Sequence, residues 1–477
     1  MKKYYIYLFS LTMLSACSDF LDLQPEHQIS DGSFYQNADD FRTALIGSYG
    51  GLQNLHNTAL VYLGELPTDN AEVRWTSPTV AEVELEEVNF TPANGFLNTV
   101  WSICFTTISR SNNILSRLDE VEMNEQTKNQ FRGEALFLRA YSYFQLVRIF
   151  GPVPVVEVAF RSPVEIDAFD MSRKPVSEVY GLIVSDLNQA AALLDGVTGL
   201  SKSRASTGAA KTLLGKVYLT QNEFGAAENV LKEVIDADTY SLMDDYKVLF
   251  TNGNDDLPES IFEIKYMSGN LGVGNNFSSI FTPARFDMDI FPNAMQGSGR
   301  VLPTQDIADT YEEGDLRRAL SIGDSVLLNT GNYERELHGL KFVDFTTGVQ
   351  GDGGINFTTL RYADVLLMYA EALNQNGKQD EALTYLNQVR DRAGLNGLAA
   401  LSPEALALAL EHERRVEFFL EGHRWFDLVR TGRLLAVMND YFQRNNLSFR
   451  AEEHNLIMPI PLREIDINPN LGQNPGY

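Results

Sequence analysis

The sequence has little cysteine, little tryptophan and no cluster of basic residues. Its 477 residues include two cysteines and three tryptophans, so a framework of disulfide bonds does not hold the fold together. Lys and Arg number 38 against 64 Asp and Glu, which gives a formal charge of −26 at pH 7. Because nucleic-acid binding needs a positive surface that displaces counterions, this balance argues against a nucleic acid as partner.

Motifs of catalysis are also missing. None of the six histidines forms an H-E-x-x-H pair, and the chain has neither a G-x-S-x-G nucleophile elbow nor a phosphate-binding loop. The stretch from Asn252 to Asp256 alternates oxygen-bearing side chains as calcium loops do, but it lacks the glycine and the closing glutamate of such loops. We interpret it as a polar turn and expect a protein that is not an enzyme and requires no metal or cofactor.

The first seventeen residues are typical of a secretory signal that ends in a lipidated cysteine. Lys2 and Lys3 precede an apolar run, residues 4–14, that is too short to span a bilayer. Leu14-Ser-Ala-Cys17 resembles a bacterial lipobox. The residue after it is Ser18 and not the aspartate that in bacterial lipoproteins favours retention on the inner membrane, so we expect an outer-membrane location. We therefore expect residues 1–16 to be removed and acyl chains on Cys17 to anchor the mature chain. The alternative is an ordinary signal peptide with an incidental cysteine.

Pairs of amphipathic segments recur at the spacing of tetratricopeptide repeats. Residues 361–394 span 34 positions, with Ala370 and Ala382 allowing two helices to approach and Asn376-Gly377 forming the turn. Similar pairs are predicted at 210–236, at 132–149 with 176–195, and at 403–430. Strand signals are few and short, as at 261–266. The sequence predicts an all-α fold of tetratricopeptide-like repeats with few short strands.

Two long insertions interrupt the helical pattern, at about 60–100 and about 252–357. The second is rich in glycine, asparagine and phenylalanine and shows no clear helices. Irregular segments of this length are uncommon in compact domains and are usually functional, and repeat scaffolds hold such loops in place. We expect the functional surface to lie in these two insertions.

Motifs along the whole chain resemble the SusD/RagB family of outer-membrane lipoproteins. The N-terminal motifs are Cys17-Ser-Asp-Phe-Leu-Asp22, Trp101 with Arg110-Ser-Asn-Asn-Ile-Leu115, Phe131-Arg-Gly-Glu-Ala-Leu-Phe-Leu-Arg-Ala-Tyr141 and Phe150-Gly-Pro-Val-Pro154. The C-terminal motifs are Leu360-Arg-Tyr-Ala-Asp364, Glu413-Arg-Arg-Val-Glu-Phe418, Gly422-His-Arg-Trp-Phe-Asp-Leu-Val-Arg430 and Ile457-Met-Pro-Ile-Pro461. They occur in the order that the family has.

The resemblance implies a helical fold of tetratricopeptide-like repeats with a loop-rich face. It implies a non-catalytic, cell-surface glycan-binding lipoprotein that acts as a lid on a SusC-like TonB-dependent transporter in Bacteroidetes-type bacteria. It also implies a single body, residues 17–477, with an N-terminal part at about 18–225 and a C-terminal part at about 255–477. The alternatives are a lipid-anchored protein that binds only peptides or protein partners, and a surface hydrolase.

Several residues of these motifs read as parts of the scaffold. We expect Trp101, Trp425 and the unpaired Cys104 to be buried. Glutamates recur every four residues before and after position 417, and we interpret them as an ion-pair ladder rather than as catalytic carboxylates. The ladder consists of Glu413, Glu417 and Glu421, with Arg414, Arg415 and Arg424 as the expected partners.

Glycan binding requires aromatic planes for the apolar faces of sugar rings and polar side chains for the hydroxyls. Trp75 is the one tryptophan in an insertion, and both glycan contact and a loop-pinning role are open for it. The candidates are Trp75, Asp69, Asn70 and Arg74 in the first insertion and Tyr266, Phe277, Phe281 and Phe286 in the second. The aromatics of the second insertion have two alternative roles, as loop anchors and as transporter contacts. The negative charge favours a neutral polysaccharide, unless Arg74 and Arg285 form a local positive spot.

Overall fold

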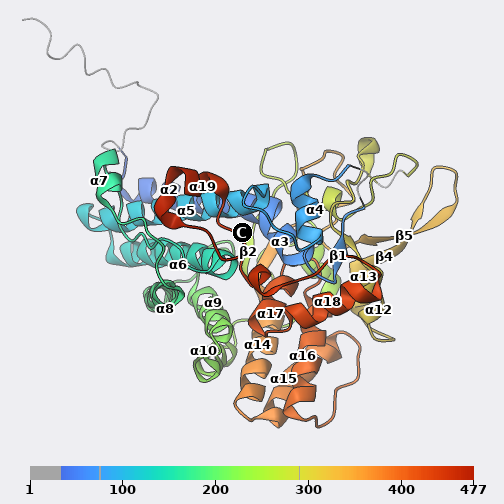
Figure 1. The fold of residues 1–477 in the computed structure, drawn as a ribbon. Helices are drawn as coiled ribbons and strands as arrows, with labels where there is room; N and C mark the ends of the chain where they lie inside the picture. Colours follow the sequence, from blue (N-terminus) through green and yellow to red (C-terminus); the bar gives the residue numbers. More distant parts are fainter. Residues whose placement is uncertain (1–33, 75–76, 289–290) are drawn as a thin grey trace, which may run out of the picture.

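The computed structural model describes residues 34–74, 77–288 and 291–477. In these ranges the protein is mainly helical, with a few short strands, as the sequence predicts (Figure 1). Among the helices of the described residues, none is both long and apolar enough to cross a membrane. The predicted lipidation site Cys17 and the candidate Trp75 lie outside the described residues.

The N-terminal part is a series of helices that pack in chain order. The long ones are α2 (Ala38–Leu55), α5 (Gly95–Arg117), α6 (Glu125–Phe150), α8 (Val176–Leu193), α9 (Thr207–Thr220) and α10 (Phe224–Asp236). From α5 onward each of these helices packs against the next, and α2 packs against α5. Shorter elements lie between them, namely a π-helical turn (His56–Leu60), α3 (Val61–Glu65), α4 (Val80–Glu86) and α7 (Pro163–Ala168).

Local sequence explains how the α9–α10 pair forms. The Ser206 side chain accepts a hydrogen bond from the backbone N–H of Ala209 and so caps α9. Asn222 adopts the left-handed conformation, with φ +61°, in the turn between the helices. A Cβ on Gly215 would lie 2.5 Å from the Leu231 side chain. The small residue at position 215 therefore allows the close helix packing that the repeat pattern predicts.

The C-terminal part continues the same series. Its helices are α14 (Tyr362–Gln375), α15 (Gln379–Arg392), α16 (Pro403–Glu417), α17 (Arg424–Arg430), α18 (Leu434–Arg444) and α19 (Leu462–Ile467). Helix α14 packs against α10 of the N-terminal part and also against α15 and α16. The pair predicted at 361–394 is α14 with α15. The residues predicted as a pair at 403–430 form α16 and α17, but α17 packs mainly against α3 and α18.

Three residues expected in the core are buried there. Trp101 is 4% exposed, Trp425 is 1% exposed, and Cys104 is fully buried with a free thiol. The indole of Trp425 meets the ring of Phe90 edge to face at 5.6 Å. These contacts assign both tryptophans to packing.

The second insertion contains more regular structure than the sequence indicates. Its elements are β2 (Ser260–Ile264), α11 (Phe277–Ile280), β3 (Leu302–Pro303), α12 (Gln305–Thr310), α13 (Leu316–Ser321), β4 (Ile322–Leu327), β5 (Tyr333–Gly339) and β6 (Phe357–Arg361). The expectation of an insertion without clear helices is therefore wrong. Helices of four to six residues give too few turns for a periodic pattern, and the hairpin strands β4 and β5 are largely polar.

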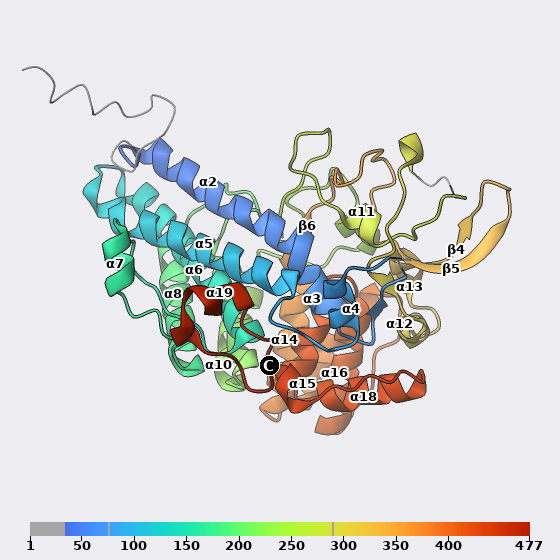
Figure 2. The same cartoon turned by 45° about the horizontal axis from the view of Figure 1, so that its top comes forward.

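Three small antiparallel sheets form within and between the insertions, and one of them joins the first insertion to the second. Strand β1 (Ala71–Glu72) pairs with β3, and Ala71 lies opposite Pro303. Strands β2 and β6 pair near the ends of the second insertion, and β4 pairs with β5 as a hairpin. Figure 2 shows this hairpin and the segments around α11 beside α3 and α4. The two insertions, separate in the sequence, thus form one region of the molecule.

Candidate functional site

Two candidates of the first insertion, Asp69 and Asn70, lie in the interior. Both carboxylate oxygens of Asp69 accept hydrogen bonds from Arg424, each at 2.9 Å. Asn70 accepts a hydrogen bond from Arg415 at 2.8 Å, and the exposed fractions of Asp69 and Asn70 are 2% and 1%. Burial disfavours the charged form of Asp69, but Arg415 and Arg424 outweigh it and lower the pKa. The structure places this pair in the packing of the body, where both side chains hold arginines of the C-terminal part.

The arginines considered as a positive spot are neutralised. Arg74 pairs with Glu72 and donates to the carbonyl oxygens of Pro303 and Leu337, both at 2.9 Å. Arg285 forms ion pairs with three carboxylates, those of Asp287, Glu334 and Glu336, at 2.7 to 3.0 Å. Neither guanidinium supplies an unpaired positive charge to a ligand.

Three aromatic candidates of the second insertion anchor its base. Phe277 and Phe281 are fully buried and stack on each other with ring centroids 5.8 Å apart. Tyr266 is 6% exposed and donates its hydroxyl to the backbone oxygen of Gln53 at 2.8 Å. These three residues have the anchoring role that the sequence left open, and their rings are not accessible to a ligand.

The fourth aromatic candidate, Phe286, is 84% exposed. Tyr333 and Phe345 are also exposed, and these three are the exposed aromatic side chains of the described residues. Phe345 stacks on the buried ring of Phe291 at 5.7 Å, which fixes its orientation. All three belong to the surface formed by described residues of 69–86, 266–300 and 322–353, which we call the loop face. The sequence analysis missed Tyr333 and Phe345, although Tyr333 stands as a single aromatic among polar residues.

A groove of about 630 Å³ lies on the loop face between residues 295–300 and 348–350. Gln296, Ser298, Arg300 and Gln350 line it with amide, hydroxyl and guanidinium groups. The Ser298 backbone N–H donates to the carbonyl oxygen of Ser279 at 2.7 Å, and the Gln350 side chain donates to the Ser279 hydroxyl at 3.0 Å. The groove is thus built directly on α11 and the segment that follows it.

Close backbone packing shapes this groove. A Cβ on Gly297 would lie 2.3 Å from the carbonyl oxygen of Thr282, and a Cβ on Gly348 would lie 2.5 Å from the Asn293 side chain. Since real side chains do not approach so closely, only glycine fits these two positions without displacing the neighbouring segments. The glycine content of the second insertion therefore has a packing cause here.

The first insertion is fastened to the rim of the groove. The backbone N–H of Arg74 donates to the carbonyl oxygen of Gly299 at 2.9 Å, and Arg300 forms an ion pair with Glu82 of α4. The backbone N–H of Val73 donates to the Glu86 carboxylate at 3.0 Å, which closes the segment between them. Arg74 and α4 are therefore held against the segment that lines the groove.

The glutamate ladder is an ionic network, but its predicted partners are wrong. Glu413 pairs with Arg317 and Arg390, and Glu421 with Lys341 and Arg361. Glu417, at the centre, pairs with Arg317, Arg361 and Arg392. The expected partners pair instead with other carboxylates. Arg414 pairs with Asp364 and Asp427, Arg415 with Asp69 and Asp306, and Arg424 with Asp69 and Glu411. The network partners come from distant segments, which a pattern of neighbours along the chain does not reveal.

A buried carboxyl group lies where α3 meets the end of this network. Glu65 is fully buried and accepts a hydrogen bond from the backbone N–H of Gly422 at 2.8 Å. No cation forms an ion pair with it among the described residues. Burial raises the pKa of Glu65 to about 8, and the hydrogen bonds from Gly422 and Asn70 offset part of that rise. Glu65 is therefore protonated at neutral pH.

The described residues place no group of three or more His, Cys, Asp or Glu side chains where it could hold a metal ion. Asp256, in the stretch that alternates oxygen side chains, accepts hydrogen bonds from the Ser201 hydroxyl and the Lys202 backbone N–H instead. Its carboxylate thus fastens the stretch to residues 201–202.

Two family models match separate parts of the chain. The model of the SusD family matches residues 328–477, and a model described as starch-binding and associating with the outer membrane matches residues 19–219. A SusD-like protein of Formosa agariphila, P38, is 30% identical over an alignment that covers 99% of this chain and 98% of that protein.

Solved structures agree with this assignment. A laminarin-binding SusD-like protein has a TM-score of 0.79 and 29% identity, with coverage of 93% of this chain and all of that chain. A SusD homologue of Bacteroides thetaiotaomicron, 22% identical, shares the fold with a TM-score of 0.81 over 94% of this chain and 98% of its own. The chain therefore belongs to the SusD family of glycan-binding proteins associated with the outer membrane, as its sequence motifs predict.

Proposed function

We propose that this protein is a non-catalytic lipoprotein that binds a neutral glycan on the loop face and delivers it to a SusC-like TonB-dependent transporter. One observation carries the proposal. The exposed aromatic side chains of the described residues, Phe286, Tyr333 and Phe345, all lie on the loop face that also holds the polar groove.

The chemistry of this surface suits sugars. Aromatic rings offer flat apolar area with few rotatable bonds, so that stacking costs little conformational entropy. Amide and hydroxyl groups such as those of Gln296, Ser298 and Gln350 hydrogen-bond to sugar hydroxyls. Trp75 stays a predicted ligand contact, because its neighbour Arg74 is bound to Gly299 at the rim of the groove.

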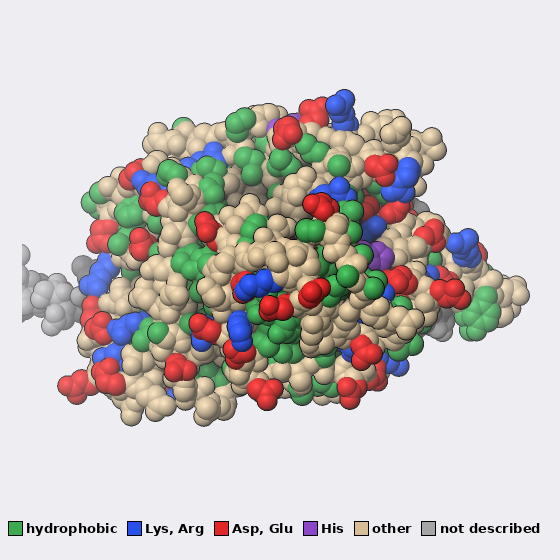
Figure 3. Space-filling view, turned by 90° about the horizontal axis from the view of Figure 1, so that it is seen from below, with side chains coloured by type: hydrophobic (Ala, Val, Ile, Leu, Met, Phe, Trp, Pro, Cys, Tyr) green, Lys and Arg blue, Asp and Glu red, His purple; other side chains and the backbone are tan. Residues whose placement is uncertain are grey.

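The charges of the loop face favour a neutral ligand. Arg74, Arg285 and Arg300 are each paired with at least one carboxylate. Arg335, whose guanidinium donates to the side chain of Gln305, is the one loop-face arginine without an ion pair to a carboxylate among the described residues. The chain as a whole carries a charge of −26. On the underside of the molecule, the view of Figure 3, acidic and basic side chains are interspersed as well. Laminarin is the first glycan to test, because a relative with 29% identity and the same fold binds it.

The membrane anchor and the transporter complete the proposal. Acyl chains on Cys17 would hold the protein at the outer membrane. Such a tether raises the effective concentration of the protein at the mouth of a transporter in the same membrane, which permits capture at modest affinity. Labelling with radioactive palmitate, lost in Cys17→Ser, tests the anchor.

Calorimetric titration with laminarin oligosaccharides, malto-oligosaccharides and an anionic oligosaccharide tests whether the protein binds a glycan and which class it prefers. Phe286→Ala, Phe345→Ala and Trp75→Ala are compared with Leu408→Ala, which removes an apolar side chain that is 53% exposed on α16. We expect binding of one neutral class, weakened by loop-face substitutions and unchanged by Leu408→Ala. Silence across the panel would contradict glycan binding and favour a peptide ligand.

A further inference from the structure

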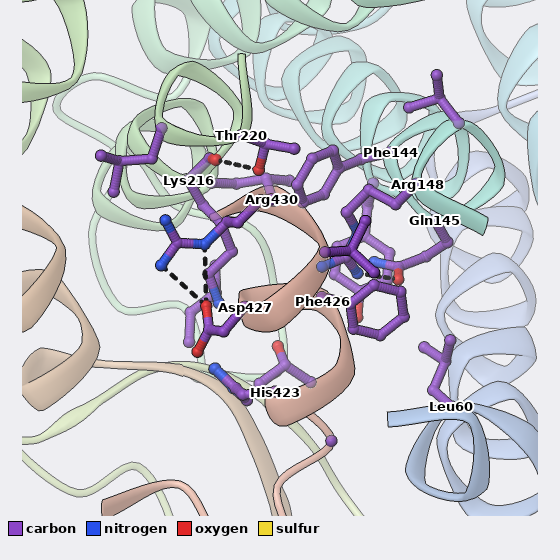
Figure 4. Close-up of a pocket in the computed structure, with 18 of the residues that line it drawn as sticks. Leu60, Phe144, Gln145, Arg148, Lys216, Thr220, His423, Phe426, Asp427 and Arg430 are labelled. Carbon is purple, nitrogen blue, oxygen red and sulfur yellow. Dashed lines mark hydrogen bonds and ion pairs between the residues drawn. The ribbon is translucent and has the colours of Figure 1, made fainter. Parts of the chain in front are cut away.

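A second cavity lies far from the groove, between the N-terminal and C-terminal parts. Its volume is about 360 Å³. Helix α6 and the π-helical turn His56–Leu60 form one wall, α9 a second and α17 a third (Figure 4). Several residues that line it, including Thr220 and Arg430, are partly exposed, so the cavity opens to solvent as a cleft. We call it the junction cleft.

The cations that line the junction cleft are paired with one exception. Lys216 pairs with Asp364 at 2.6 Å, and Arg430 pairs with Glu371 and Asp427. Arg414, a further lining cation, pairs with Asp364 at 2.8 Å. Arg148 has no carboxylate within ion-pair distance in the part of the chain that the structure describes. The acidic lining residues, Glu421 and Asp427, already have their own cations.

Aromatic rings pack against the guanidinium of Arg148, but its N–H groups are only partly hydrogen-bonded. The rings of Phe144 and Phe426 lie at 4.2 and 4.0 Å from the guanidinium carbon, one on each flank. The side-chain oxygen of Gln145 accepts one hydrogen bond, and Nε is buried without a partner. Figure 4 shows Arg148 beside Phe426 and Gln145. Burial lowers the pKa of Arg148 to about 10, as expected for a cation that lacks a counter-charge.

A second unpartnered group lines the same cleft. His56 is 5% exposed, and its Nε2 lies 2.6 Å from the Tyr141 hydroxyl. Its Nδ1 has no partner. Burial, and then the charge of Arg148, lower the pKa of His56 to about 3, so that the ring is neutral. In the tautomer that carries its proton on Nδ1, the Tyr141 hydroxyl donates to Nε2 and Nδ1 is a second donor without an acceptor.

The backbone at His56 is also unusual. Residues 56–60 form a π-helical turn inside an otherwise α-helical segment. Such turns are rare and occur often at functional sites, because the insertion of one residue redirects side chains. Here the turn places both His56 and Leu60 on the wall of the cleft.

We infer that the junction cleft binds a small organic carboxylate, with the carboxylate on Arg148 and the apolar body against the surrounding walls. The unpartnered donors require an acceptor, and the lone arginine requires a negative charge. The remaining walls are mostly aromatic and aliphatic, with Phe144, Leu213 and Met368 among them. Since a cavity of about 150 Å³ accepts benzene, a cleft of 360 Å³ accommodates an acid with a phenyl or short alkyl body.

Calorimetric titration of the purified protein with phenylacetate and hexanoate tests this inference. Phenylacetamide, which has the same body as phenylacetate but no charge, is the control ligand. We expect the acids to bind with a Kd on the order of 1 mM or tighter and the amide to bind at least about tenfold more weakly, as the loss of a charge-assisted hydrogen bond implies. Equal affinity for acid and amide, or no binding of either acid at tens of millimolar, would overturn the inference.

Substitutions then locate the site. Arg148→Met should weaken phenylacetate binding by about tenfold or more, whereas Arg148→Lys, which keeps the charge, should retain most of it. Thr220→Trp, at the partly exposed end of α9, should block the cleft without touching its charges. Thr99→Trp on α5, which does not line the cleft, is the matched control and should bind normally.

Titration of the same variants with glycan distinguishes a failure of this inference from a failure of the proposed function. All these variants should bind glycan as the unsubstituted protein does, because the groove on the loop face shares no lining residue with the junction cleft. If Arg148→Met is unfolded by circular dichroism, Thr220→Trp alone decides. Phenylacetate binding that survives Thr220→Trp would place the acid elsewhere and contradict the inference.

Discussion

Charged side chains meet opposite conditions in the glutamate network and on the loop face. In the network, Glu417 and Arg361 are 0% and 1% exposed, and each contacts several opposite charges. On the loop face, arginines are paired near the surface while Phe286 and Tyr333 extend into solvent, 84% and 74% exposed. The body therefore uses buried charge for structure, whereas the loop face presents apolar rings that are not needed for packing.

Buried and exposed charges also differ in energetic weight. An ion pair inside the protein loses hydration, and removal of one partner leaves the other charge without compensation. Exposed pairs are screened by water and contribute little. Stability and binding should therefore respond to substitutions in different regions.

The largest effect is expected for Glu417→Ala. The substitution leaves Arg361 and Arg392 without the carboxylate that lies between them. We expect the free energy of unfolding to fall by about 3–5 kcal/mol, as for other broken buried ion pairs. Urea denaturation measures it. A loss below about 1 kcal/mol would show that the network is more hydrated than its burial indicates.

The next largest effect is expected in the pH dependence of the free energy of unfolding, to which Glu65 contributes. Its pKa is about 8 in the folded protein against 4.5 for the ordinary carboxyl. The unfolded chain therefore loses this proton first as pH rises, so the stabilising contribution is complete below pH 4.5 and is lost up to about pH 8. Relative to Glu65→Gln, the native protein should lose roughly 2 kcal/mol between pH 6 and pH 8, at about 1.4 kcal/mol for each pH unit.

Urea denaturation of both proteins at several pH values measures this difference. Glu228→Gln is a suitable control because this carboxylate is paired with Lys378 and its pKa is lowered. Between pH 6 and pH 8, the free energy of unfolding of Glu228→Gln should fall as much as that of the native protein. Parallel curves for native protein and Glu65→Gln would contradict a neutral Glu65.

A smaller effect, on binding alone, is expected for Phe286→Ala and Phe345→Ala. Loss of one stacking ring should weaken glycan binding by roughly tenfold or less, in line with about 0.5–1.5 kcal/mol for an aromatic contact. The free energy of unfolding should change by less than about 0.5 kcal/mol for Phe286→Ala, since the side chain is exposed. Calorimetry and urea denaturation on the same samples separate the two quantities.

The smallest effect is expected for Lys232→Ala. Lys232 pairs with Asp236 on α10, and the two side chains are 55% and 59% exposed. Its removal should change the free energy of unfolding by about 0.3–0.5 kcal/mol at most. Urea denaturation of Lys232→Ala and Glu417→Ala compares the loss of an exposed ion pair with the loss of a buried one in the same assay. A loss similar to that of Glu417→Ala would remove the contrast between the regions.

The helical body could be predicted from the sequence because its signals are local. The turn at Gly377 and the apolar period of α14 and α15 are visible within 34 residues, and family motifs occur along the chain. Burial of Trp101 and Trp425 followed from the same patterns. Local periodicity thus carries the information that helix packing needs.

The surface residues were less predictable because their positions depend on pairing across long distances. Asp69 appears in an insertion but pairs with Arg424, 355 residues away. Phe281 and Phe286 are five positions apart in the same insertion, yet one is fully buried and the other is 84% exposed. Composition identified the insertions, and only the tertiary contacts distinguish an anchor from an exposed ring.

The pairing of β1 with β3 has a consequence for the order of folding. Arg74 and Pro303 are separated by 229 positions, and their contact closes a very long loop. Such contacts form late, because the entropy of loop closure opposes them until the intervening chain is ordered. A chain that enters the extracytoplasmic space N-terminus first has no β3 to pair with until residue 303 has emerged. The surface proposed to bind glycan is therefore completed only after most of the polypeptide has been delivered and folded.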